Sequence, residues 1–518
     1  MNLREGCKGG ALLREKLWKP NWIVFVSSAC IMIIELVASR MIAPYLGVSL
    51  YTWTSVIGVV LAGISLGNYL GGKIADRFAS RRALGFIFLG AGLVSLSILV
   101  LNEPACSLSW PGFLPYMARV LLATAAIFFL PSYFLGMISP LIVKLTLKDL
   151  ERTGDTVGKI YAYSALGSIV GTFATGFFLI SWFGSQANVW FVSLVLILMG
   201  LLFGDWGGWR GIALIVPFSL GLALAPHFLG LMKSPCLAET NYFCIDIFDE
   251  ALEDDGKLKV LVLDHLVHSY VNLEDPAHLV YEYEKVYASV TDYIAKNRSP
   301  LKTLFIGGGG YTMPRYLEKI HPGSLIEVVE IDPDVTRLAY EELGLPPDTT
   351  IRTYNEDARI FLNNLGHVKG KYDLVYGDAF NGYAVPYHLT TLEFNEIVKR
   401  ILKEDGFYLA NVIDRYTKGH FLRAYLHTLE QTFPYVYIVP ATNCWEGGCR
   451  STFVFIAGAQ PLDSAALQQS ITDPARAWIL EMLWSEEQKE RFLASGRAVL
   501  LTDDYAPVDN LIAPILTD

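Results

Sequence analysis

The feature that most constrains this chain is a stretch, residues 21–232, in which long apolar runs follow one another with few charges between them. Only 18% of all residues are charged, against about 25% in average soluble proteins. A helix that crosses a bilayer needs about 20 apolar residues. We therefore predict a multi-span α-helical membrane domain with about seven helices. The seven runs are 22–42, 52–74, 83–101, 116–140, 158–180, 187–204 and 211–231.

Two charged residues, Glu35 and Arg40, lie inside the first run. Charges within a membrane are costly, and they often have a function. The two are five positions apart, so they do not share one helix face well. Arg40 could equally lie near the membrane interface, and both interpretations stay open.

Lysine and arginine are distributed unevenly among the loops, because the loops 43–50, 102–115 and 181–187 carry none. The positive-inside rule then predicts that the N-terminal segment 1–20 is cytoplasmic. Seven spans would leave the C-terminal part outside, whereas one span fewer would place it inside, so the side stays open. The basic residues that decide the orientation are Arg4, Lys8, Arg14, Lys16, Lys19, Lys73, Arg77, Arg81, Arg82, Lys144, Lys148, Arg152 and Lys159.

Two close pairs of cysteines, Cys236/Cys244 and Cys444/Cys449, allow more than one interpretation. Close pairs suit disulfides in an oxidising compartment. A zinc site is disfavoured because neither pair has the usual two-residue spacing, and we predict no metal. Four reduced thiols remain the plain alternative.

The remainder of the chain has the pattern of an ordinary soluble protein. Short strands predict a small β-region over 238–275, and residues 276–518 then alternate strand and helix. That alternation predicts an α/β Rossmann-like domain of the methyltransferase type, with a doubly wound parallel sheet. The expected strands are Thr303–Ile306, Leu325–Glu330, Thr350–Tyr354, Leu374–Gly377 and Tyr408–Val412.

Glycines and acids follow four of these strands, where such sheets bind ligands. A run of glycines, Gly307 to Gly310, follows the first strand and would let a ligand approach the backbone. Glu330 ends the second strand and could accept hydrogen bonds from ribose hydroxyls. Asp357 could accept from an adenine amino group, or it could simply cap a helix. Asp378 could take a proton from an attacking amine, or it could cap a turn.

Taken together, these residues resemble the spermidine synthase (polyamine aminopropyltransferase) family, in a form fused to an N-terminal multi-span domain. The resemblance covers about 240–460, and its motifs are specific jointly rather than singly. The matching segments are Leu261–Asp264 followed by His268, Ile306–Gly310, Val329–Asp332, Glu356–Ala358, and Tyr372–Asp378.

The resemblance implies a transferase of spermidine biosynthesis. Decarboxylated S-adenosylmethionine would donate an aminopropyl group to an amine such as putrescine, and methylthioadenosine would leave. Asp378 would be the proton acceptor, and no cofactor is implied beyond this cosubstrate. The residues implied to bind the nucleoside or donor are His268, Gly307, Gly308, Gly309, Glu330, Asp357 and Ala358.

The departures from the family lie on the amine side of the site. Gly310 stands where the family has an acid beside the donor arm, and Asn381 stands where it has a second acid. His268 replaces a glutamine. The family's Tyr-His-Glu segment has become Tyr281–Glu284, so Glu282 takes the place of the histidine. Gly310, Asn381 and Glu282 are the candidate amine-binding positions, and Glu282 and Glu284 could compensate for the lost acids.

Two other functions stay open. One is a different S-adenosylmethionine enzyme on the same scaffold, transferring a methyl group or cleaving the methionine arm. The other is a transporter or sensor that binds a nucleoside or a polyamine. The expected partners are a nucleoside sulfonium, a diamine and the lipid bilayer, and a homo-oligomer is possible by analogy. The net charge of −10 and the absence of a basic stripe in the sequence argue against nucleic acid.

Overall fold

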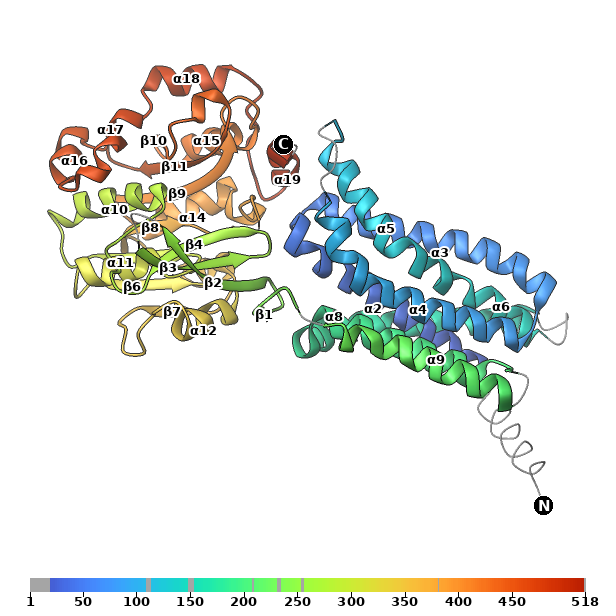
Figure 1. Cartoon of the computed structure of the whole chain (residues 1–518). Helices are drawn as coiled ribbons and strands as arrows, with labels where there is room; N and C mark the ends of the chain where they lie inside the picture. Colours follow the sequence, from blue (N-terminus) through green and yellow to red (C-terminus); the bar gives the residue numbers. More distant parts are fainter. Residues whose placement is uncertain are drawn as a thin grey trace. The chain divides into compact units, whose positions relative to one another are not determined.

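The computed structural model describes residues 19–108, 113–147, 153–206, 209–230, 234–252, 256–380 and 382–516. The chain divides into two compact units, Met1–Cys244 and Ile245–Asp518 (Figure 1). The first unit is helical and the second is an α/β domain. The predicted β-region 238–275 straddles this division, because the two-residue strand β1 (Ala238–Glu239) belongs to the first unit.

Within the described residues, five helical segments are long and apolar enough to cross a membrane, which confirms the predicted multi-span domain. They are Pro20–Leu46, Leu50–Phe78, Arg81–Cys106, Tyr116–Thr146 and Thr153–Phe203. The helices of this unit are α2 (Pro20–Leu46), α3 (Leu50–Phe78), α4 (Arg81–Cys106), α5 (Tyr116–Gly136), α6 (Ile138–Thr146), α7 (Thr153–Ala174), the π-helix η2 (Thr175–Leu179), α8 (Ile180–Phe203) and α9 (Trp209–Phe228).

The segment Thr153–Phe203 contains two of the runs seen in the sequence and turns between them. Its 51 residues would extend about 75 Å as one straight helix, far more than one bilayer core. Gly184 interrupts it with a left-handed backbone, φ 72° and ψ 170°, a conformation that glycine adopts without steric cost. The segment therefore consists of two helices that meet at Gly184.

Glycines set the packing and the direction of the membrane helices. A side chain at Gly63 or Gly71 of α3 would collide with α5 at Ser132 or with Met137 just beyond it. Similarly, Gly167 and Gly171 of α7 lie against Phe25 and Ala29 of α2. Small residues allow this close approach, which drives association in lipid. The order of these contacts makes α3 parallel to α5 and α2 parallel to α7. Leu89 of α4 lies at Gly200, and Gly92 at Ser193 and Ile197, so α4 and α8 are antiparallel.

The residues that leave the helical unit, 236–244, form a compact structure that we call the exit collar. The Arg40 guanidinium donates to the Tyr242 carbonyl at 2.8 Å and also to the carbonyls of Thr240, Asn241 and Phe243. Cys236 and Cys244 form a disulfide, with their Cα atoms 5.3 Å apart. Arg40 is therefore the donor that satisfies the carbonyls of the collar. We have no structural account of Glu35.

The exit collar lies at the same end of the unit as the loops that lack lysine and arginine. The Glu239 carboxylate accepts from the backbone N–H of Ser185 at 2.9 Å and from the Ser185 hydroxyl, beside the turn at Gly184. The Tyr116 hydroxyl donates to the Leu46 carbonyl at 2.5 Å. At the opposite end, the Lys144 ammonium pairs with Asp76 at 2.8 Å. The basic loops and the exit collar are therefore at opposite faces.

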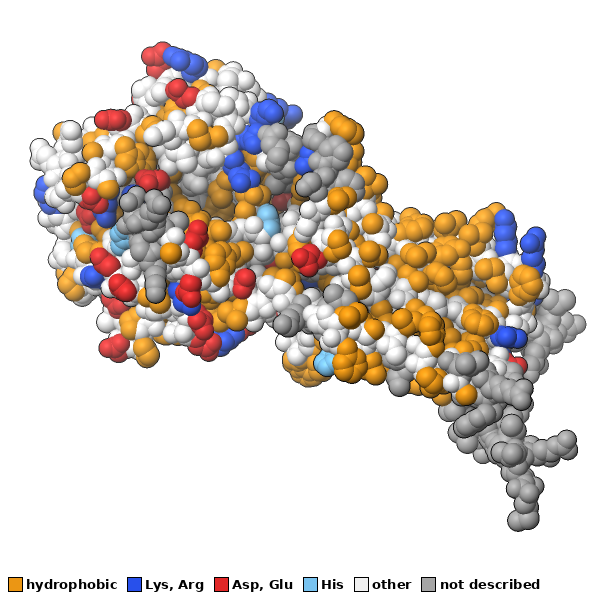
Figure 2. Space-filling view, in the orientation of Figure 1, with side chains coloured by type: hydrophobic (Ala, Val, Ile, Leu, Met, Phe, Trp, Pro, Cys, Tyr) orange, Lys and Arg blue, Asp and Glu red, His pale blue; other side chains and the backbone are white. Residues whose placement is uncertain are grey.

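The two units differ in the side chains that they expose. Figure 2 shows apolar side chains over much of the visible helical unit, whereas acidic and basic side chains gather on the α/β unit. The exposed apolar residues of the helices include Leu61, Phe178, Trp182 and Phe183. Large exposed apolar surfaces mark contact with a membrane or a protein, and a lipid environment fits helices of this length.

The α/β unit begins with a small antiparallel sheet in which β2 pairs with β3 and β3 with β4. The main sheet has the order β10-β11-β9-β8-β5-β6-β7. Its strands and those of the small sheet are β2 (Cys244–Leu252), β3 (Gly256–Leu263), β4 (Leu266–Asn272), β5 (Lys302–Ile306), β6 (Leu325–Val329), β7 (Arg352–Tyr354), β8 (Tyr372–Gly377), β9 (Leu402–Arg415), β10 (Tyr435–Pro440) and β11 (Arg450–Gly458).

The five predicted strands are all present and run parallel to one another, as expected. The prediction of an entirely parallel sheet is corrected by β11, which runs antiparallel to both β9 and β10. An antiparallel strand inserted at this place is the methyltransferase type of Rossmann-like sheet, so the predicted fold class is confirmed. The hydrogen-bonding direction of β11 depends on its neighbours, which a strand's own apolar pattern does not report.

Helices cover both faces of the main sheet. Buried apolar side chains from β5, β6 and β8 form two clusters, one on each face. The helices are α10 (Glu282–Ala295), α11 (Thr312–Ile320), α12 (Pro333–Glu341), α13 (Ala358–Asn364), α14 (Leu392–Ile401), α15 (Phe421–Thr432), α16 (Ser464–Ser470), α17 (Trp478–Met482), α18 (Glu486–Ala494) and α19 (Val508–Ile512), with short 3₁₀ turns η3 (Tyr387–Leu389), η4 (Trp445–Gly447), η5 (Pro474–Arg476) and η6 (Ala513–Leu516).

We predict that Arg40→Met destabilises the helical unit. The carbonyls of the exit collar would lose a charged donor, which lowers the free energy of unfolding by about 2 kcal/mol. The measurement is the unfolding midpoint in detergent, followed by the reaction of the buried cysteines Cys30 and Cys106 with a thiol reagent. Arg77→Met, at an exposed position of α3, is the control that should unfold like the wild type. Equal midpoints for the two variants would contradict the role of Arg40.

Candidate active site at the carboxyl ends of the strands

The glycine run after β5 brings the backbone of two strands together. Gly307 has φ +98°, and a side chain there would collide with the Asp378 backbone. The Asp378 N–H donates to the Ile306 carbonyl at 2.9 Å, and the Gly307 N–H donates to the Val329 carbonyl at 2.9 Å. Only glycine combines this backbone conformation with this approach. The run therefore fixes the end of β8 next to the end of β5.

Glu330, just beyond the end of β6, is held by backbone donors from that same loop. Its Oε2 accepts from the N–H of Gly308 at 2.7 Å and of Gly309 at 3.4 Å, and its Oε1 accepts from the Asp332 N–H at 3.0 Å. Burial raises the pKa of the carboxyl, and the three N–H donors oppose that rise. A carboxylate has about four acceptor positions, so Glu330 can still accept from a ligand.

Asp357 caps a helix, which was the structural alternative to a contact with adenine. Its Oδ1 accepts from the Ile360 N–H at 3.0 Å, so the residue caps α13, which starts at Ala358. Its Oδ2 lies 3.1 Å from Nε2 of His388. A capping aspartate retains acceptor capacity, so the cap does not exclude a contact with adenine.

Asp378 is held in one orientation by two side chains from different elements. Its Oδ1 accepts from the Asn411 amide at 2.7 Å, and its Oδ2 accepts from the Tyr283 hydroxyl at 3.2 Å. Burial raises the pKa of Asp378 to about 6, against the opposing effect of these two hydrogen bonds. A carboxylate in this state is ionised at neutral pH and is a stronger base than an exposed aspartate.

A second acid, Glu284, enters the same cleft from α10. It is 2% exposed, and its Oε2 has no hydrogen-bond partner. Burial raises the pKa of Glu284 well above its usual value, and the neighbouring Asp378 raises it further. Two carboxyl groups in one dry cleft do not both ionise readily. Ionisation of Asp378 therefore disfavours ionisation of Glu284.

Strand β4 also lines the cleft and contacts the glycine run. Burial and the neighbouring His265 lower the pKa of His268 to about 4, so its imidazole is neutral at pH 7. The Nε2 of His268 is buried and has no hydrogen-bond partner. The Ser269 hydroxyl accepts from the Gly310 N–H at 2.9 Å. A neutral histidine with an unused nitrogen is available for a polar ligand.

The structure brings most of the predicted site residues to one cleft. His268, Gly307 to Gly309 and Asp378 line it, and Glu330 adjoins it through the glycine N–H groups. Gly310, Asp357 and Ala358 are not among the lining residues. The lining residues are Leu266, Val267, His268, Ser269, Tyr281, Tyr283, Glu284, Phe305, Gly307, Gly308, Gly309, Thr312, Met313, Pro314, Asp378, Phe380, Gly382, Asn411, Ile413 and Thr452.

Glu282, one of the candidate amine-binding positions, lies away from the cleft. The Glu282 carboxylate pairs with the Lys285 ammonium at 2.8 Å and does not line the cleft. Asn381 lies outside the described residues.

Sequence analysis missed Tyr283 and Asn411, which position Asp378. Asn411 had a signal, since it is an amide inside the otherwise apolar strand Tyr408–Val412. An amide there must find a partner when it is buried. Tyr283 had none, because only the fold turns its hydroxyl toward Asp378.

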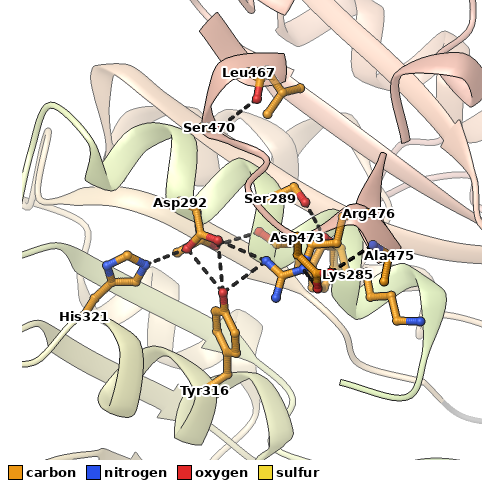
Figure 3. A network of polar contacts seen from close by, with 12 residues as sticks. Lys285, Ser289, Asp292, Tyr316, His321, Leu467, Ser470, Asp473, Ala475 and Arg476 are labelled. Atoms are coloured by element: carbon orange, nitrogen blue, oxygen red, sulfur yellow. Dashed lines mark hydrogen bonds and ion pairs between the residues drawn. The ribbon is translucent and has the colours of Figure 1, made fainter. Parts of the chain in front are cut away.

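Helix α10 is fixed at its other end by a polar network (Figure 3). The Asp292 carboxylate contacts Nε2 of His321 at 2.8 Å, the Tyr316 hydroxyl at 3.1 Å and the Arg476 guanidinium at 3.0 Å. These partners come from the end of α11, from within α11 and from η5. The network ties α10 to two other elements and so helps to hold Tyr283 and Glu284 at the cleft.

We predict that Gly310→Ala destabilises the α/β unit. A Cβ at this position would lie 2.6 Å from Cβ of Ser269 and 2.7 Å from Cγ2 of Val271. Such overpacking costs about 1–3 kcal/mol. The control is Gly447→Ala, where an added Cβ meets nothing within 4 Å. The unfolding midpoints of the two variants are compared, and a normal midpoint for Gly310→Ala would contradict the packing argument.

The chain is similar in sequence to known polyamine aminopropyltransferases. A polyamine aminopropyltransferase of Vibrio vulnificus is 37% identical over 115 residues, which are 22% of this chain and 38% of that protein. Polyamine aminopropyltransferase 2 of Ralstonia nicotianae is 22% identical over 460 residues, 82% of this chain and 84% of its own. No family model matches the chain.

Solved structures are also similar to the chain. A probable spermidine synthase from Corynebacterium glutamicum matches 49% of this chain and 93% of its own, with 22% identity and a TM-score of 0.43. The match to the Vibrio protein spans well under two thirds of that relative's length. The resemblance to polyamine aminopropyltransferases is confirmed, and these relatives are transferases.

Proposed function

We propose that the α/β unit is a polyamine aminopropyltransferase with Asp378 as the proton acceptor. The observation that carries the proposal is the position of Asp378 at the end of β8. There its carboxylate is oriented by Tyr283 and Asn411, in a cleft that also contains the glycine run. The named activity of the relatives supports the same chemistry.

The proposed reaction is a single displacement. The lone pair of the amine nitrogen attacks the propyl carbon bound to the sulfonium. The C–N bond forms while the C–S bond breaks, its electrons neutralise the sulfur, and methylthioadenosine leaves. Asp378 takes the proton that the nitrogen loses. Because the sulfonium is already a good leaving group, the protein needs mainly to position the amine, accept its proton and exclude water.

The nucleoside half of the cleft would hold the donor. Glu330 would accept from the ribose hydroxyls, with the glycine N–H groups fixing its orientation. Asp357 would accept from adenine while it caps α13, with Ala358 beside it. His268 would offer its unused Nε2 to the donor. Decarboxylated S-adenosylmethionine is the proposed donor, and a diamine such as putrescine is the proposed acceptor.

We predict that Asp378→Asn removes turnover and leaves the affinity for methylthioadenosine within about twofold, since the amide retains the shape but not the basicity. In the wild type, kcat/KM should fall about tenfold per pH unit below pH 6, because the pKa of Asp378 is about 6 and only the ionised form accepts a proton. Initial rates measured from pH 5 to 8 check both statements. Turnover by the asparagine variant would refute the assigned role.

Gly310 favours a second candidate, an enzyme that uses intact S-adenosylmethionine. Gly310 lacks the acid that the family places beside the donor arm, so the carboxylate of an intact methionine arm would meet no repulsion there. Product analysis with both donors, each with and without putrescine, separates the two. Methylthioadenosine and spermidine from the decarboxylated donor alone support the first. S-adenosylhomocysteine, or methylthioadenosine from the intact donor without an amine, would replace it with the second.

We also propose an orientation, with the N-terminus in the cytoplasm and the α/β unit on the opposite side. Because α2 and α7 are parallel and α4 is antiparallel to α8, the basic loops share one face and the exit collar lies at the other. Disulfides at Cys236–Cys244 and Cys444–Cys449 suit an oxidising compartment. The donor would then have to reach that compartment.

A fusion of alkaline phosphatase, which is active only after export, tests this orientation in a bacterial inner membrane. We expect activity when the enzyme is fused after the C-terminus of the whole chain. A control fusion after Leu147, in a basic loop, should be inactive. The reverse pattern would place the α/β unit in the cytoplasm and overturn the proposed orientation, whatever the enzyme assay finds.

A further inference from the structure

The cleft lacks the acids that a cationic amine would need at the expected places. The acid beside the donor arm is replaced by Gly310, and the structure leaves no room for a side chain there, because Ser269 and Val271 fill the space. Glu282, a sequence candidate for the amine side, pairs with Lys285 away from the cleft. A dicationic substrate needs negative charge from some other residue.

Glu284 of α10 is an acid that lines the cleft and could supply this charge. Residues 282 and 284 are two positions apart on α10, which separates their side chains by about 200° around the helix. One faces Lys285 and water, and the other faces the cleft beside Asp378. The Glu284 side chain is 2% exposed, and its Oε2 has no hydrogen-bond partner. A buried polar atom without a partner costs free energy unless a ligand satisfies it.

Resting on the proposed aminopropyl transfer, we propose that Glu284 is the specificity-determining residue for a cationic amine and that it releases its proton to solvent when the amine binds. The unpartnered Oε2 accepts a hydrogen bond from the ammonium group. Asp378, from the end of β8, then takes the proton of the attacking nitrogen. The two acids thus divide the work, Glu284 binding one cation and Asp378 accepting a proton.

The electrostatics of the cleft support this division. The titratable groups that line the cleft around Glu284 are Asp378 beyond β8, His268 from β4, Tyr283 from α10 itself and Tyr281 just before it. Burial and Asp378 both raise the pKa of Glu284, whereas the Tyr281 backbone, the Thr312 side chain and Lys285 oppose that rise. A bound ammonium would add a positive charge in a dry site, which favours the ionised form. Binding of the amine is thereby linked to loss of one proton from Glu284.

The test is calorimetry of putrescine binding to the whole protein in detergent, saturated with methylthioadenosine, at pH 7.5 in two buffers of different ionisation enthalpy. We expect the wild type to release about one proton per site. Glu284→Gln should release none and should raise the KM for putrescine about 10- to 100-fold, the loss expected when a hydrogen bond to a charged group is removed. Its affinity for methylthioadenosine should be unchanged, which shows that the cleft is folded.

Two further variants sharpen the test. Glu282→Gln makes the same chemical change on the other face of α10 and should release a proton like the wild type. Glu284→Asp retains the carboxyl group and should restore proton release in part. The proposal is overturned if Glu284→Gln still releases a proton, if Glu282→Gln abolishes the release, or if Glu284→Asp behaves like Glu284→Gln.

Failure of the inference and failure of the proposed function give different results. If the wild type makes spermidine while Glu284→Gln has a normal KM and normal proton release, the function stands and the role of Glu284 is wrong. If the wild type binds putrescine with proton release yet yields no product from either donor, the role of Glu284 stands and aminopropyl transfer is wrong.

Discussion

The candidate site depends on the pairing of β5 with β8. That pairing places the glycine run and Asp378 side by side, with the Asp378 N–H donating to the Ile306 carbonyl. Gly307 permits the approach, since a side chain there would collide with the Asp378 backbone. The remaining cleft residues are placed around this contact, Glu330 through the glycine N–H groups and Tyr283 through the Asp378 carboxylate. A larger residue at position 307 would separate the nucleoside half of the cleft from Asp378, the proposed proton acceptor.

Burial gives the cleft its chemical character. Burial disfavours the charged forms of Asp378, Glu284 and His268. The pKa values shift in opposite directions for acids and bases. Those of the two carboxyl groups rise, so the ionised acids are stronger bases, whereas the pKa of His268 falls and its imidazole stays neutral. The site therefore combines two acids with raised pKa values and one histidine with a lowered pKa, and a bound cation would favour the ionised form of the acids.

In the helical unit, one charge inside a predicted span has a clear physical role. Arg40 satisfies the carbonyls of the exit collar, and Glu239 of the collar in turn binds Ser185 of α8, just beyond the turn at Gly184. Backbone groups near a membrane must find partners within the protein. The collar therefore explains why a costly charge is retained on α2 and fixes the face at which the chain leaves this unit.

The sequence by itself determined the class of each half and most of the site. Apolar runs of spanning length predict the helices, and acids at successive strand ends predict Glu330 and Asp378, because both signals are local in the chain. The tertiary structure decided what depends on packing between distant segments. It set the antiparallel direction of β11, brought Asn411 and Tyr283 to Asp378, and turned Glu284 rather than Glu282 toward the cleft. Side chains two positions apart on a helix point in nearly opposite directions. Only the packing of α10 determines which of the two, Glu282 or Glu284, is buried.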